Sequence, residues 1–331
     1  MFAKLLKYYI KSVGKVGIPS VIVILIGGFI GFLLSAVFST LMYFMTDVII
    51  WNINVYEQNL SGYILVASDI ILTLYMIAVF ASFFALFAVI IFITFGGTVI
   101  LVITVVNFYK TLITDEGYLT FTLPVSPTTI LCSKLTNSVI WNIIMTLAQI
   151  VAGLGMATPF VAISIIDEIV NPTPGVEAAK PTVFEIISDI LSALGGIGSA
   201  ITTIIFVLVM IIVTQLLYFF AVFLGGVIAK KHKLLLAAGF VILAHVMFTS
   251  VQQGIQFFVT AVVAVLGSLV GVVAIFLEGL LKIDGFYVIS SSVTTIITPA
   301  SNIINILIFG AIAVVLFFLT NYLMNKKLNL Q

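Results

Sequence analysis

Two very long uncharged stretches constrain the fold of this chain more than any other feature. No charged side chain occurs between Ile70 and Tyr109, and none between Leu234 and Leu277. Charged residues make up 8% of the chain and hydrophobic residues 63%, whereas a soluble domain carries about 25% charged residues. A helix needs roughly 20 apolar residues to cross a bilayer, and barrel strands are about 10 residues long and alternate. The sequence therefore predicts an all-α integral membrane protein.

Six apolar segments are long enough to cross a bilayer. They lie near residues 19–45, 70–100, 136–165, 200–228, 234–260 and 300–324. Cytoplasmic loops of membrane proteins carry an excess of lysine and arginine. With a cytoplasmic N-terminus, six crossings leave only Lys180 and Lys282 outside. All the other lysines fall in the inner segments 1–17, 107–134, 230–233 and 325–331. We therefore expect both termini in the cytoplasm.

The two uncharged stretches are each too long for one perpendicular crossing. A helix over 70–109 would measure about 60 Å, against a hydrocarbon core of about 30 Å. Splitting it would move the lysines of 230–233 outside, so we expect the second span to tilt and continue into the cytoplasm. After the fifth span we expect a re-entrant or outer hairpin before span six. Its break is expected near Gly254 or Gly267.

Two amphipathic helices are expected beside the spans. The first is an interfacial helix over residues 1–17. Its apolar face holds Phe2, Leu5, Leu6, Tyr9, Ile10 and Val13, and its charged face holds Lys4, Lys7, Lys11 and Lys15. Such a pattern lies flat on an anionic leaflet. The second begins at Thr182, three residues before Glu185, inside an outer loop over 166–199. Either helix could serve as a plain membrane anchor or take part in gating or cargo capture.

Glycine and tryptophan positions suggest where helices meet lipid or one another. Gly27 and Gly31 have the spacing of close helix packing, as do Gly267 and Gly271. Trp51 and Trp141 fall near expected span ends. Aromatic rings favour the membrane–water interface, so we expect both rings there.

The segment over residues 107–134 is the polar part of the chain best suited to contact another protein in water. Residues 115–117 read Asp-Glu-Gly, a short apolar helix follows, and Pro124 stops it. Ser126 and Pro127 form a good N-cap and first-position pair, so the third span should start there. Lys134 is expected at headgroup depth. The pattern alone leaves two interpretations open, an interfacial connector or a coupling helix that docks in a partner's groove.

The residues of this segment resemble a known family. Phe108 to Leu112, Asp115 to Thr120, Thr122 to Pro127 and Ser133 to Leu135 resemble the loop after the second span of ABC-2-type transporter permeases, especially a branch of Gram-positive, clostridia-like bacteria. The turn over 229–233 and the tail over 326–330 are also similar to that branch. The strong similarity covers about 30 residues, and the six-span layout covers the rest loosely.

The resemblance implies a single transmembrane permease domain over 1–331 in a bacterial cytoplasmic membrane. It implies two partner ATPase subunits and a second permease subunit, either an identical copy or a paralogue. The ATPase-coupling residues would be Asp115, Glu116, Gly117, Tyr118, Leu119, Phe121, Leu123, Pro124 and Ser126. Among these, Tyr118 stands where many relatives have threonine.

The chain has no phosphate-binding loop of its own. Gly14-Lys15-Val16 lacks the first glycine and the hydroxyl that such a loop requires. ATP and magnesium would therefore bind to the partner ATPase, and we expect this chain to be non-catalytic and to bind no cofactor. A net charge of +1 gives no footprint for nucleic acid, and the single cysteine, Cys132, excludes an internal disulfide. Membrane lipids are the remaining expected partner.

Three cargo and mechanism classes remain open at this stage. Export of amphipathic peptides or toxins, or immunity to them, is the first interpretation, and export of lipids, drugs or other hydrophobic molecules is the second. An ion-coupled carrier is the third, with His245 as its one candidate relay group deep in a span. Gln149, Gln215 and His245 are the candidate cargo-path residues, although polar groups within spans more often pack helices together. Spacings typical of an intramembrane enzyme are absent from the sequence.

Overall fold

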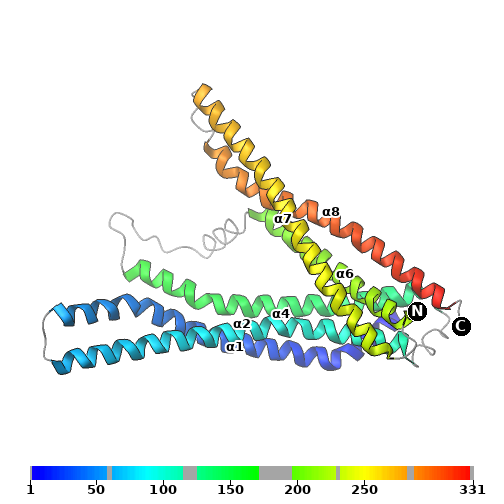
Figure 1. Ribbon diagram of the computed structural model, residues 1–331, viewed down its shortest axis with the longest axis horizontal. Helices are drawn as coiled ribbons and strands as arrows, with labels where there is room; N and C mark the ends of the chain where they lie inside the picture. Colours follow the sequence, from blue (N-terminus) through cyan, green and yellow to red (C-terminus); the bar gives the residue numbers. More distant parts are fainter. Residues whose placement is uncertain are drawn as a thin grey trace. The chain divides into compact units, whose positions relative to one another are not determined.

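The computed structural model describes residues 2–57, 62–114, 125–170, 196–228, 232–281 and 287–328. These ranges form long α-helices, shown in Figure 1. The helices are α1 (Phe2–Glu57), α2 (Gly62–Ile113), α4 (Pro127–Val170), α6 (Gly196–Ile228), α7 (Lys233–Leu281) and α8 (Tyr287–Leu328). All six are long and apolar enough to cross a membrane, and each expected span lies within one of them. The prediction of six spanning helices is confirmed at this level.

The second span is a single helix, as the charge pattern predicted. α2 runs for 52 residues without interruption, which corresponds to about 78 Å at 1.5 Å per residue. That length exceeds a hydrocarbon core of about 30 Å more than twofold. The helix must therefore continue beyond the core at one or both ends.

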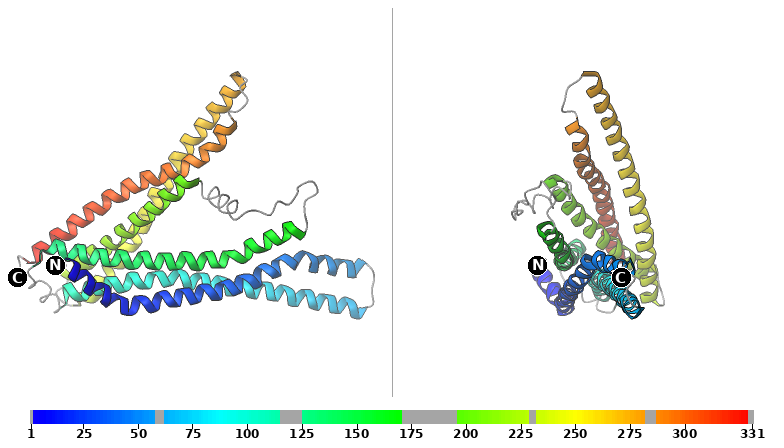
Figure 2. Two further views of the ribbon diagram at one scale, coloured as in Figure 1. Left: turned by 180° about the vertical axis from the view of Figure 1, so that it is seen from behind. Right: turned by 90° about the vertical axis from the view of Figure 1, so that its left-hand side faces the viewer.

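The expected break in α7 is wrong. The helix passes through Gly254 and Gly267 and ends only at Leu281. A helical glycine costs about 1 kcal/mol relative to alanine, whereas each unsatisfied backbone group in hydrocarbon costs several. A lone glycine is therefore too weak to break a helix there. α7 and α8 contact each other and α6, and Figure 2 shows α7 and α8 side by side beyond the end of α6.

The N-terminal helix does not end at residue 17 as expected. α1 continues through Pro19 to Glu57 as one helix. The predicted faces are nevertheless present, because all four lysines before residue 17 are exposed while Leu5, Leu6 and Ile10 are half-buried. Tyr9 on the apolar face is only 4% exposed. This face is therefore covered at Tyr9 by protein rather than by lipid alone.

The third helix runs past its expected end. α4 continues to Val170, five residues into the predicted outer loop over 166–199. The amphipathic helix expected from Thr182 lies outside the described residues.

Contacts divide the chain into two units. Unit 1 contains residues 1–12, 103–140 and 180–331, and unit 2 contains residues 13–102 and 141–179. The core of unit 1 is apolar. Its buried centre comprises Val213, Leu216, Phe309 and Leu316. The Phe309 ring lies between Phe206 and Phe248, with centroid distances of 6.2 and 6.0 Å.

Unit 2 packs α1 closely against α2 and α4 at glycines. A Cβ added to Gly28 would lie 2.5 Å from Ala152 Cβ, and one added to Gly31 would lie 2.4 Å from Met156 Sδ. A Cβ on Gly27 would lie 3.3 Å from the Phe92 ring of α2. The close packing predicted from Gly27 and Gly31 is therefore present. The surroundings of Gly267 and Gly271 are outside the described side chains.

Trp141, which the sequence predicts near a span end, is buried by protein. Its side chain is 6% exposed, and its indole covers Gly14 and Gly17 of α1. A Cβ on Gly17 would lie only 2.7 Å from the ring atom Cζ3. The glycines supply a flat surface that a large ring can cover, and this packing outweighs the interfacial preference. Trp51, by contrast, is 44% exposed.

Substitution of Gly28 by alanine should destabilise unit 2. The added methyl would lie 2.5 Å from Ala152 Cβ and 2.8 Å from its Cα, so backbone must move, at a cost of about 1–3 kcal/mol. Gly153 is the matched control, because nothing lies within 4 Å of a Cβ added there. Thermal unfolding in detergent should show a lower midpoint for Gly28→Ala and an unchanged or higher one for Gly153→Ala. Equal midpoints for the two variants would contradict the close packing.

Candidate functional site

The start of α4 is capped as the sequence predicted. The backbone N–H of Thr129 donates to the Ser126 carbonyl at 3.0 Å and to Ser126 Oγ at 3.3 Å. α4 then begins at Pro127. Ser126 is the one predicted coupling residue within the described ranges. The others, Asp115, Glu116, Gly117, Tyr118, Leu119, Phe121, Leu123 and Pro124, lie outside them.

Lys134, which the sequence predicts at headgroup depth, is buried by neighbouring helices. Its side chain is 4% exposed. Its ammonium lies 4.1 Å from the centre of the Tyr9 ring and donates a hydrogen bond to Thr111 Oγ1. One cation therefore joins α1, α2 and α4 within unit 1. A buried charge is costly unless its partners compensate it, so the ring and the hydroxyl are part of what keeps the ammonium in place.

A polar shell surrounds this cation. We call it the Lys134 junction, and it comprises Tyr9, Thr104, Asn107, Thr111, Lys134, Asn137 and Ser138. Most of these residues, with Phe108 and Phe219, line a cavity of about 10 Å³, the smallest volume that can hold one water. Asn137 Oδ1 is buried and has no hydrogen-bond partner within the described part of the chain. A single water donating to this oxygen would satisfy it.

α6 joins the same junction from the other side. The rings of Phe108 and Phe219 are stacked at 4.1 Å with an interplanar angle of 7°. One turn away, Thr104 Oγ1 donates to Gln215 Oε1 at 3.4 Å. Gln215 is 1% exposed, so this cargo-path candidate is buried in a helix–helix contact rather than on an open surface.

The other two cargo-path candidates also have partners. Gln149 belongs to unit 2, and its Nε2 donates to the Ile93 carbonyl of α2 at 2.9 Å. His245 belongs to unit 1, where its Nδ1 lies 2.5 Å from the Tyr218 hydroxyl. Gln215 and Tyr218 are neighbours on one face of α6, so the structure brings His245 near the junction through α6.

Sequence reasoning missed the junction because its members come from distant segments. The sequence pattern predicts Tyr9 on a lipid-facing surface and Lys134 at the depth of the lipid headgroups. A local signal did exist, since the polar residues Thr104, Asn107 and Thr111 recur at helical spacing just before the predicted coupling segment. Such a stripe at the end of an apolar helix indicates a polar partner.

The described residues hold no group of three or more His, Cys, Asp or Glu side chains close enough to bind a metal ion. No protein-family model, curated protein or solved structure matches this chain.

A double-mutant cycle tests the contact between Tyr9 and Lys134. Tyr9→Leu removes the ring and leaves the cation less compensated, so it should lower stability. In a Lys134→Met background the same change should cost less, because no buried charge remains. The expected coupling free energy is about 0.5–2 kcal/mol, measured from unfolding midpoints of the four proteins. Strictly additive effects would contradict an energetic contact.

Proposed function

We propose that this chain is the membrane subunit of an ATP-driven exporter of the ABC-2 type in a bacterial cytoplasmic membrane. Its cargo is an amphipathic peptide or toxin, which it expels or against which it protects the cell. The observation that carries the proposal is the Lys134 junction. Its residues on α2 and α4 flank the segment that we assign to coupling, and they contact α1 and α6.

The junction suits the transmission of mechanical work. Thr111 lies near the end of α2, just before the coupling segment, and Lys134 lies two turns into α4, just after it. Removing one partner from a buried charge is strongly destabilising. Displacement of the segment therefore favours concerted motion of α2 and α4 with their partners. ATP and magnesium bind to two partner ATPase subunits, and a second permease subunit completes the transporter.

An ion-coupled carrier has weaker support. Such proteins use ionisable groups inside the membrane to bind or relay ions. His245 is the candidate for that role, and its Nδ1 is engaged by the Tyr218 hydroxyl. A hydrogen bond between α6 and α7 is a sufficient role for this histidine.

Reversal of the charge at Glu116 should break the association with the ATPase. A positive charge would replace the acid that the family resemblance assigns to the docked contact, so Glu116→Lys should not co-purify with a co-encoded ATPase. Glu185→Lys is the matched control, because the charge pattern places Glu185 on the opposite side of the membrane. Equal recovery of ATPase with both variants would overturn the proposal.

A cysteine introduced at residue 116 tests the expected orientation. In a Cys132→Ala background, an impermeant maleimide added to intact cells should leave Glu116→Cys unlabelled and should label it after the membrane is opened. Labelling from outside in intact cells would contradict a cytoplasmic coupling segment.

A further inference from the structure

α7 carries a stripe of polar side chains within its uncharged stretch. We call it the α7 polar stripe, and it comprises His245, Thr249, Gln252, Gln253, Gln256 and Thr260. Positions three or four apart lie on one face of a helix, and these residues follow one another at that spacing, with Gln252 and Gln253 adjacent. The stripe is about 22 Å long at 1.5 Å per residue. His245, Gln253 and Thr260 are exposed, and the remaining members are half-buried.

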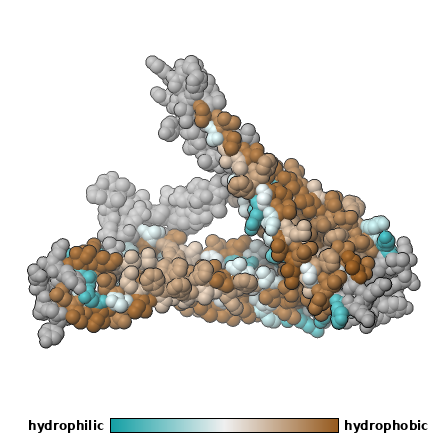
Figure 3. Space-filling model, viewed as in Figure 1, coloured by the Kyte–Doolittle hydropathy of each residue, from teal (hydrophilic) through white to brown (hydrophobic). Residues whose placement is uncertain are grey.

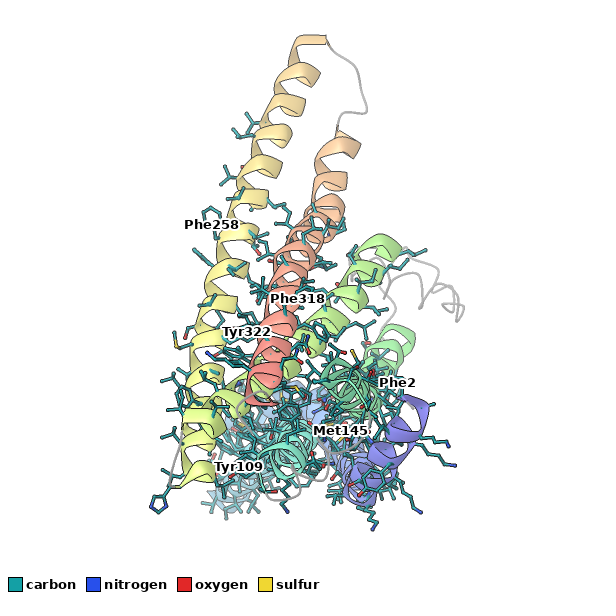
Figure 4. All side chains as sticks on the ribbon, turned by 90° about the vertical axis from the view of Figure 1, so that its right-hand side faces the viewer. Phe2, Tyr109, Met145, Phe258, Phe318 and Tyr322 are labelled. Atoms are coloured by element: carbon teal, nitrogen blue, oxygen red, sulfur yellow. The ribbon has the colours of Figure 1, made fainter. Side chains whose placement is uncertain are left out.

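The other side of α7 is apolar at the same depth. Gly254, Ile255, Phe258 and Val262 line an open groove of about 360 Å³ together with residues of α8. Phe258 is 68% exposed and is labelled in Figure 4. In Figure 3 most of the coloured surface along α7 is likewise hydrophobic. This part of α7 lies within a segment long and apolar enough to cross a membrane. Its one-sided pattern therefore points to α8 and lipid on the apolar face and to something polar on the other.

The glutamine amides of the stripe are unsatisfied within the described part of the chain. The side chains of Gln252, Gln253 and Gln256 make no hydrogen bond with the described residues. Transfer of an amide into an apolar medium without a hydrogen bond costs roughly 2–7 kcal/mol. Three such groups on one face are therefore incompatible with lipid tails. Polar residues within membrane segments generally face a bundle interior or a water-filled cavity.

We propose that the α7 polar stripe is one wall of a hydrated path and that it binds neutral hydrogen-bonding groups of the cargo. The assignment of a cargo rests on the function proposed above, whereas the hydration of the stripe does not. Amides both donate and accept hydrogen bonds, so they match a peptide backbone or neutral polar side chains. The stripe's amides and hydroxyls carry no charge, and they therefore offer an ion little selectivity.

The exposed ring beside the stripe suits the other face of an amphipathic molecule. Phe257 is 78% exposed and lies one turn from Gln253 on α7. A peptide with one polar and one apolar face could place the polar face on the glutamines and the apolar face on this ring. This arrangement narrows the cargo to molecules that combine neutral polar groups with an apolar surface.

Cysteine accessibility tests whether the stripe is hydrated. Cys132 is the sole native cysteine, so single cysteines are introduced in a full-length Cys132→Ala protein in native membranes. Gln253→Cys, Gln256→Cys and Thr260→Cys probe the stripe, and Phe258→Cys and Val262→Cys are controls of similar depth. Because a thiolate forms poorly in apolar surroundings, the stripe positions should react with a maleimide at least about tenfold faster than the controls.

The alternatives give different outcomes. Equal reactivity at stripe and control positions would mean that α7 has the same surroundings, water or lipid, on all its sides. This result would overturn the proposal. Slow labelling of the stripe, together with oxidative cross-linking of Gln253→Cys between two copies, would assign the stripe to a subunit contact and would also overturn it. None of these readouts needs an ATPase, so they stand apart from a failure of the proposed function.

A second measurement addresses the cargo. The assay measures ATP-driven uptake of a fluorescein-labelled amphipathic helical peptide into inside-out vesicles. It compares the parent complex with two double variants. The stripe variant carries Gln253→Leu and Gln256→Leu, and the control variant carries Phe258→Leu and Val262→Leu. Loss of two hydrogen bonds of about 0.5–1.5 kcal/mol each should lower uptake about tenfold for the stripe variant. The control variant should transport as the parent does. If the parent transports the peptide and the two double variants are equally active, the stripe does not bind the cargo.

Discussion

The absence of water from a bilayer core governs this structure. Each backbone amide and carbonyl there must be satisfied within the protein, so helices continue where a soluble chain would turn. α1, α4 and α8 each contain a proline and remain single helices. Proline removes one backbone donor and strains the preceding turn, but ending the helix would leave several groups unsatisfied. The same balance carries α7 through its glycines.

Once the helices are formed, lipid provides no hydrophobic force to bring them together, so packing and hydrogen bonds must do so. Both units use close packing and polar contacts. In unit 2, Gly28 lies against Ala152, and Gln149 Nε2 donates to the Ile93 carbonyl. In unit 1, Gly225 lies against Ala237, and Asn302 Nδ2 donates to Thr203 Oγ1 at 2.9 Å.

Features set by local chemistry could be predicted from the sequence. The six apolar helices, the undivided α2 and the cap at Ser126 depend on residues near each other in the chain. The identity of distant neighbours could not be predicted. Nothing near Lys134 in the sequence reveals that Tyr9 stands opposite it, and nothing near Trp141 reveals two glycines on α1. The prediction of a break in α7 failed for another reason. Glycine ends helices readily in water, but not where the freed backbone groups would face hydrocarbon.

A single turn of α6 connects the two polar regions of unit 1. Gln215 and Phe219 contact the Lys134 junction through Thr104 and Phe108, while Tyr218 between them bonds to His245, the first residue of the α7 polar stripe. Real proteins depart from the rules of their environment mainly at functional sites, and both regions depart from the rule that spanning helices are apolar. A rotation of this turn would alter the contacts of the cation and the position of the stripe together. Because the turn is shared by both regions, it would provide a physical route by which motion beside the proposed coupling segment reaches the surface that we propose binds the cargo.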